Sequence, residues 1–70
     1  MTKVEQAEQT LYKELASMYS KPFFVGVGKE LPDKLVLVVY IDVTDDTAPY
    51  VSEDWEGYHV LVKDVRSLIS

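Results

Sequence analysis

Leu35-Val36-Leu37-Val38-Val39-Tyr40-Ile41 is hydrophobic at every position, and this stretch decides the fold. Its length, its valines and its flanks Pro32-Asp33 and Asp45-Asp46 favour a strand over a buried helix. Because side chains alternate along a strand, Leu35, Leu37, Val39 and Ile41 share one face, and Val36, Val38 and Tyr40 share the other. A strand that is hydrophobic on both faces is typical of the centre of a sheet.

A helix is predicted before this strand, from near residue 3 to near Tyr19. Thr2-Lys3-Val4-Glu5 fits a capping box, in which threonine and glutamate satisfy the first free N–H groups. Hydrophobic residues then recur every three or four positions and form one stripe, made of Val4, Ala7, Leu11, Leu15 and Met18. Lys21-Pro22 ends the helix, because proline lacks a donor and restricts the residue before it. The stripe predicts that this helix packs on one face of a sheet.

Two further strands are predicted, one on each side of the central strand along the chain. Residues 23–28 alternate, with Phe23, Val25 and Val27 on one face and Phe24, Gly26 and Gly28 on the other. The short connection 29–34 makes this strand an antiparallel hairpin with the central one. Glycine within a strand marks a bend or close packing.

Residues 58–65 alternate well enough for a last strand, which we expect at a sheet edge. His59 and Lys63 share one of its faces, and Tyr58, Val60 and Val62 share the other. The long connection 42–57 permits a parallel pairing, but the sequence leaves the partner of this strand open. The tail 66–70 is expected to be irregular or a single helical turn.

These elements predict one α+β domain over residues 1–70, with an N-terminal helix on a three-stranded sheet in the order α-β-β-β. A chain of 70 residues has room for one core. The absence of cysteine excludes a disulfide framework and a thiolate zinc site. Because neither a signal-peptide pattern nor a bilayer-spanning apolar run occurs, we expect a cytoplasmic protein.

The charge is unevenly placed. The net charge of −5 disfavours nucleic acid and anionic membranes as partners. Lysine and arginine are absent between Leu35 and Val62, whereas the connection 42–57 carries Asp42, Asp45, Asp46, Glu53, Asp54 and Glu56. The connection also holds Tyr50, Val51 and Trp55, which we expect to pack back on the fold as a lid.

No pattern in the chain meets the requirements of a catalytic, metal or cofactor site. The glycines of Val25-Gly26-Val27-Gly28 lie within a strand, whereas a phosphate-binding loop needs strand, glycine turn and then helix. The loop aspartates lack the alternating spacing of a calcium loop. His59 is the only histidine, and although Ser52 and Asp54 are near it in the sequence, closeness along the chain does not give the geometry of a triad. We therefore expect no enzymatic activity and no cofactor.

The face of the sheet away from the helix is the main candidate for function. Phe24, Val36, Val38 and Tyr40 need a cover there, supplied either by the connection or by another molecule. The sequence favours the connection, because Tyr50, Val51 and Trp55 are available to supply it. The candidate interaction residues are Phe24, Val36, Val38, Tyr40, Asp45, Asp46, Tyr50, Glu53, Asp54 and Trp55.

Three segments together resemble a small domain that precedes trypsin-like peptidase domains in some bacterial and plant proteins. They are Lys21-Pro22-Phe23-Phe24-Val25-Gly26-Val27-Gly28, Leu37-Val38-Val39-Tyr40-Ile41 and Trp55-Glu56-Gly57-Tyr58-His59-Val60. The corresponding patterns are V-G-V-G, L-V-V-Y-V and E-G-x-P-V, and the similarity covers residues 21–65. His59 stands where that pattern has proline, and the chain ends at Ser70 without a peptidase domain. The resemblance implies a free-standing accessory fold and not proteolysis.

The sequence thus favours a small interaction or accessory module that binds an unknown protein partner. The alternative is an acidic decoy that occupies the basic groove of a nucleic-acid-binding protein. Binding by a decoy would weaken steeply with salt, whereas an apolar interface would respond little. If the second sheet face is only partly covered, two copies would pair about a two-fold axis, so the expected state is a monomer or a weak homodimer.

Overall fold

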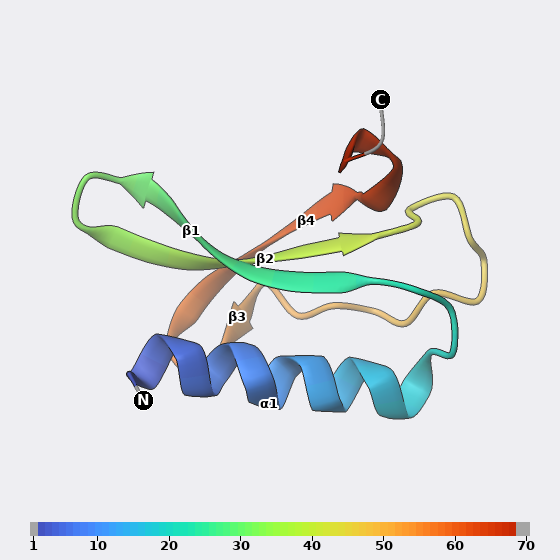
Figure 1. The fold of residues 1–70 in the computed structure, drawn as a ribbon, viewed down its shortest axis with the longest axis horizontal. Coiled ribbons are helices and arrows are strands. Elements are labelled where there is room, and N and C mark those ends of the chain that lie inside the picture. The colour runs from blue at the N-terminus through green and yellow to red at the C-terminus, as the bar shows by residue number, and fades with distance from the viewer. Residues whose placement is uncertain (1, 69–70) are drawn as a thin grey trace.

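The computed structural model describes residues 2–68. In chain order the elements are α1 (Lys3–Met18), β1 (Phe24–Leu31), β2 (Lys34–Ile41), β3 (Asp54–Trp55), β4 (Tyr58–Asp64) and the 3₁₀ helix η1 (Val65–Leu68). Helix α1 lies along one side of a single mixed sheet (Figure 1). The predicted α+β class and the β1-β2 hairpin are confirmed, but the sheet has four strands and not three. In the predicted tail, positions 69 and 70 lie outside the described residues.

Helix α1 begins at the predicted Thr2 cap and buries most of the predicted stripe. The Oγ1 of Thr2 accepts a hydrogen bond from the backbone N–H of Glu5 at 3.3 Å. Val4, Ala7, Leu11 and Leu15 are buried, but the assignment of Met18 to the stripe is wrong, because its side chain is exposed. Tyr19 takes its place: the backbone turns extended there, and the aromatic ring enters the core.

The strands are ordered β1-β2-β4-β3 across the sheet. β1 runs antiparallel to β2, with Phe24 opposite Tyr40, and β4 runs parallel to β2, with Leu61 beside Val38. The prediction that β4 is an edge strand is therefore wrong, since β3 lies beyond it in the strand order. However, β3 pairs only with Tyr58 and His59, so most of β4 has β2 as its one strand partner.

The short strand β3 and the start of β4 form a tight hairpin. The two residues between them, Glu56 and Gly57, have φ values of 51° and 88°. Two consecutive residues with positive φ are typical of the turn that suits the twist of a two-residue hairpin. A two-residue strand has too few positions for a detectable alternation, which is why the sequence did not predict β3.

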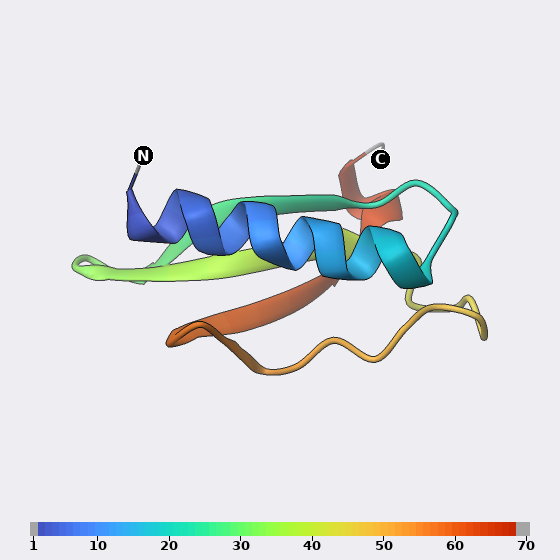
Figure 2. The ribbon, with the colours of Figure 1, turned by 90° about the horizontal axis from the view of Figure 1, so that it is seen from below.

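The core lies between the sheet and α1. It joins the helix stripe to Leu37, Val39 and Ile41 of β2 and to Val60 of β4. Ala48, Val51 and Trp55 of the connection pack against the same cluster. Figure 2 shows the helix over β1 and β2 while the connection runs past the outer side of β4. The expectation that the connection covers the second face is wrong. Its hydrophobic residues pack on the helix side of the sheet and add to the core that α1 covers.

Candidate interaction surface

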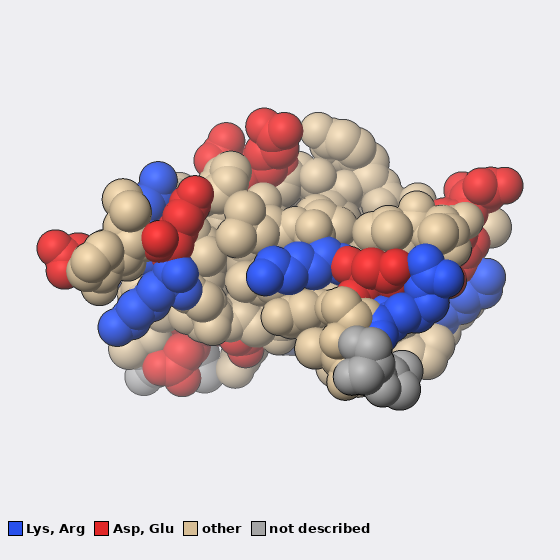
Figure 3. Space-filling model, turned by 90° about the horizontal axis from the view of Figure 1, so that it is seen from above, with Lys and Arg blue, Asp and Glu red and all other residues tan. Residues whose placement is uncertain are grey.

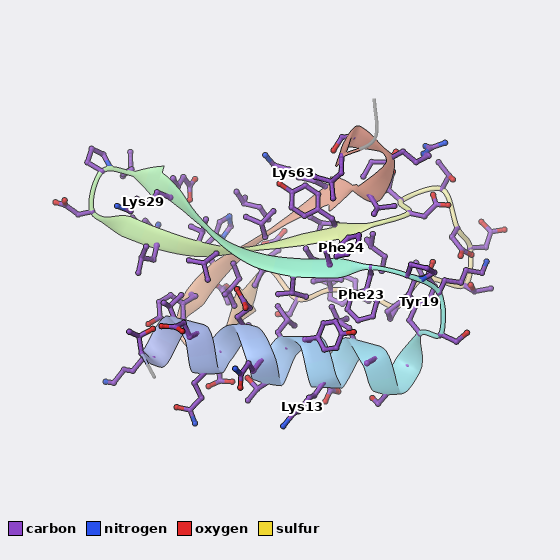
Figure 4. All side chains as sticks on the ribbon, viewed as in Figure 1. Lys13, Tyr19, Phe23, Phe24, Lys29 and Lys63 are labelled. Atoms are coloured by element: carbon purple, nitrogen blue, oxygen red, sulfur yellow. The ribbon has the colours of Figure 1, made fainter. Side chains whose placement is uncertain are left out.

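The sheet face opposite α1, here called the open face, consists of side chains from three strands. Register and alternation place on it Phe24, Val36, Val38, Tyr40, His59, Leu61 and Lys63. η1 lies at one end of this side, and within residues 2–68 neither α1 nor the connection covers it (Figure 1). In Figure 4, Lys63 lies on the side of the sheet away from the helix, whereas Phe23 lies between helix and sheet.

The open face has a packed floor and an exposed rim. Val36 and Val38 are only 1% and 9% exposed, although no second layer lies over them. Their Cγ2 atoms lie 3.7 and 3.1 Å from the position that a Cβ atom on Gly28 would occupy. The two valines therefore fill the space that this glycine leaves empty. Phe24, by contrast, is 55% exposed and stands at the rim.

The middle of the open face is mostly uncharged. Figure 3 shows this side, with uncharged side chains between acidic and basic groups and one basic side chain lying across them. Lys63 brings a positive charge to this face, beside the uncharged Val38, Tyr40 and Leu61. A hydrophobic surface that also carries a lysine side chain can bind an apolar segment of a partner together with a carboxylate or carbonyl group of that partner.

Trp55, a predicted site residue, lies on the helix side and not on the open face. Its ring is half-buried against the core, and its indole Nε1 donates to the Oγ1 of Thr10 in α1 at 3.0 Å. The same threonine hydroxyl contacts the Glu56 carboxylate. Trp55 thus fastens the β3-β4 hairpin to the helix, whereas Tyr50 in the same connection is exposed.

Asp45, another predicted site residue, is used within the fold. Its carboxylate accepts from the Tyr19 hydroxyl at 2.8 Å and from Lys21 Nζ at 2.7 Å, while both the N–H and the hydroxyl of Thr47 donate to its other oxygen. The Lys21 ammonium is the main cause that holds the pKa of the Asp45 carboxyl far below its usual value. Asp45 therefore anchors the connection to the end of α1.

Tyr19 has the complementary perturbation. Burial of its ring, followed by the hydrogen bond to Asp45, raises the pKa of the phenol to about 12. The phenol therefore stays protonated and continues to donate to Asp45 through neutral pH. The hydrogen bond is a structural feature of the fold and supplies no group poised for proton transfer near neutrality.

The remaining predicted acids, Asp46, Glu53 and Asp54, are exposed. Glu53 and Asp54 lie at β3, at the opposite end of the strand order from β1, and form an acidic edge, whereas Asp46 follows Asp45 near the end of α1. Of the ten predicted residues, four lie on the open face, three are these exposed acids, Trp55 and Asp45 are bound into the fold between helix and connection, and Tyr50 is exposed within the connection.

Leu61 and Lys63 belong to the open face but were not among the predicted site residues. Alternation along residues 58–65 assigns Lys63 to one face of its strand. It does not show which neighbouring strand that face lies beside. Only the parallel register with β2 sets these two residues next to Val38 and Tyr40.

The described part of the chain holds no cluster of three or more histidine, cysteine or acidic side chains arranged for a metal ion. Within it, α1 is too short and too polar to cross a membrane. Fold and surface together define a small α+β protein with one uncovered sheet face. No family model, no curated protein and no solved structure matches the chain.

Proposed function

We propose that the protein is a small cytoplasmic interaction module, without a catalytic step of its own, that binds a protein partner through the open face. The observation that carries this proposal is the exposed Phe24 beside a packed floor of Val36 and Val38, with neither helix nor connection over them. Aromatic side chains are enriched in protein interfaces and are common among the residues that contribute most of the binding energy. A partner that covers Phe24 would remove from water the largest exposed apolar group of this face.

The proposal is tested by site-specific photo-cross-linking in the cells that make the protein. A photoreactive amino acid replaces Lys63 on the open face or Lys13 of α1, since both side chains are exposed and lie on opposite sides of the sheet (Figure 4). We expect a foreign protein to be captured from position 63 and not from position 13. The cross-link should disappear with Phe24→Ser, which changes an exposed side chain.

Equal capture from both positions, or persistence of the cross-link with Phe24→Ser, would contradict binding through the open face. Products of twice the 8.0 kDa chain mass are pairs of this chain and are scored separately.

An acidic decoy is the second candidate function, favoured by the exposed Asp46, Glu53 and Asp54 of the connection and β3. A basic partner would then be captured from position 50, because Tyr50 is exposed within the connection. Capture from this position should fall steeply as salt is added, since exposed charge pairs are screened. Capture that is insensitive to salt and occurs from position 63 would rule out the decoy.

A further inference from the structure

β1 (Phe24–Leu31) is an unpaired edge of the sheet. It ends the strand order and has only β2 as a partner, and it crosses in front of the other strands in Figure 1. Within residues 2–68, no backbone hydrogen bond outside the regular ladder reaches it. Alternate N–H and C=O groups along its outer side are therefore free to pair with another strand.

This edge lacks the features that usually prevent such pairing. It contains no proline, no charge occurs from Phe24 to Gly28, and its one register irregularity lies at its far end, between Lys29 and Leu31. Natural sheets blunt free edges with short strands, charges, prolines or bulges. The opposite edge of the sheet is partly paired. There β3 pairs with the start of β4, and the N–H of Val60 donates to the carbonyl of Glu53 at 2.7 Å.

Exposed hydrophobic side chains flank the free edge on both sides. Phe24 stands on the open-face side, and Val27, 41% exposed, stands on the helix side. On the helix side of the sheet, a shallow groove between α1 and β1 is lined by Glu8, Gln9, Tyr12, Lys13 and Val25. The exposed Tyr12 is held in place by stacking on Phe23, with ring centroids 4.9 Å apart. A strand added to β1 would bury apolar surface in addition to making backbone hydrogen bonds.

The distribution of charge selects a second copy of this chain as the added strand. The groove carries one acid, Glu8, and one base, Lys13, and β1 carries Lys29 and Glu30, so this side is locally neutral. In an antiparallel pair the two helices run in opposite directions, and the acid of each groove faces the end that carries the base of the other. The acids at β3, Glu53 and Asp54, lie at the outer edges of the paired sheets, and Asp45, nearer to β1, is paired with Lys21. A basic foreign segment would instead be steered to the acidic edge.

We propose that two copies associate by antiparallel pairing of their β1 strands about a two-fold axis. The two four-stranded sheets become one continuous sheet, with both α1 helices on one side and both open faces on the other. The inference stands independently of the proposed function. If both hold, the dimer presents two copies of the open face side by side and so binds a repeated partner with higher avidity.

The first test compares two lysine substitutions by sedimentation equilibrium, from micromolar to millimolar protein. Val27→Lys puts a charge at the proposed interface, and Val62→Lys is the matched control, because Val62 is 44% exposed on the helix side of β4. We expect the parent and Val62→Lys to rise from 8.0 kDa toward twice that mass. Val27→Lys should stay monomeric, with its helical and strand content verified by circular dichroism.

A parent mass that stays at 8.0 kDa up to millimolar protein would overturn the proposal, as would equal self-association of both lysine variants. The second test keeps the proposal falsifiable if Val27→Lys does not fold. The chain has no cysteine, so single cysteines can be placed at Val25, Gly26, Val27 and, as control, Val62. Directly opposite residues in an antiparallel pair lie within disulfide reach.

At least one of the three β1 cysteines should form an intermolecular disulfide much faster than the cysteine at position 62. Equal oxidation rates at all four positions would mean that contact between copies is random, which would refute the pairing of β1.

Discussion

Adding one methyl group to either of two glycines in β1 should change the stability of the protein in opposite directions. Gly26 and Gly28 both face the open side of the sheet, and neither has a positive φ. A Cβ atom on Gly26 would have nothing within 4 Å. Because alanine restricts the unfolded chain more than glycine does, Gly26→Ala should raise the free energy of unfolding by about 0.4–1 kcal/mol.

Gly28→Ala restricts the unfolded chain in the same way, but crowding in the folded protein lowers the free energy of unfolding by more than this restriction raises it. The added Cβ would lie 3.1 Å from Cγ2 of Val38, which is buried beside Val36 and cannot move freely. Overpacking of a filled site costs about 1–3 kcal/mol, so the net change is a loss of roughly 0.5–2 kcal/mol. The two variants should therefore differ by about 1–3 kcal/mol, or roughly 4–20 °C in Tm for a domain of this size.

Thermal and urea unfolding followed by circular dichroism measure this difference at a protein concentration where the chain is monomeric. The Val38→Ala background supplies the control, because it removes the methyl group that the new Cβ meets. In that background Gly28→Ala should no longer destabilise the protein relative to Gly26→Ala. If the two alanines change stability equally in the parent, the packing of Val38 over Gly28 is refuted.

Val38→Asp should reduce the free energy of unfolding by several kcal/mol, because it puts an unpaired charge at a position only 9% exposed; an unchanged melting temperature would show that this face is solvated. Trp55 should emit at shorter wavelength than a solvated indole, and Trp55→Ala should cost less than about 3 kcal/mol, since the ring is half-buried; free quenching would contradict its packing. The pKa of Asp45 is lowered in the fold, so its stabilisation is present above its unfolded value of about 4 and is lost as pH falls toward the folded pKa; acid titration of Asp45→Asn should lack this loss. The pKa of Tyr19 is raised to about 12, so its contribution is complete below its unfolded value of about 10 and is lost as pH rises through the folded pKa; Tyr19→Phe should remove that alkaline loss.

The features that the sequence predicted well depend on local chemistry. The capping box at Thr2 and the proline at position 22 mark the limits of α1, and both act within one helical turn. The alternation of Val36, Leu37 and Val38 fixes which side chains share a face, because it follows from strand geometry alone. These interpretations needed no knowledge of what the segments pack against.

The features that the sequence missed depend on contacts between distant segments. The parallel pairing of β4 with β2 places Leu61 and Lys63 on the open face, and residue spacing within β4 does not encode its partner. Tyr19 replaces Met18 in the core because the chain leaves the helix at that point to reach β1. Glu56-Gly57 between Trp55 and Tyr58 was the one local signal for β3, since glycine adopts the positive φ that the turn needs.

The sequence by itself determined that a strand with two hydrophobic faces would sit in the sheet, with one helix to cover one face. Only the tertiary structure decided where the acidic connection would bury its hydrophobic residues. Burial of apolar surface has no direction, so Val51 and Trp55 could have been buried against either face. The helix side prevails because Thr10 accepts from the indole of Trp55 there, and Tyr19 and Lys21 hold Asp45 at the end of α1. Polar groups from a distant helix direct the connection to one side, and the other side of the sheet is left open.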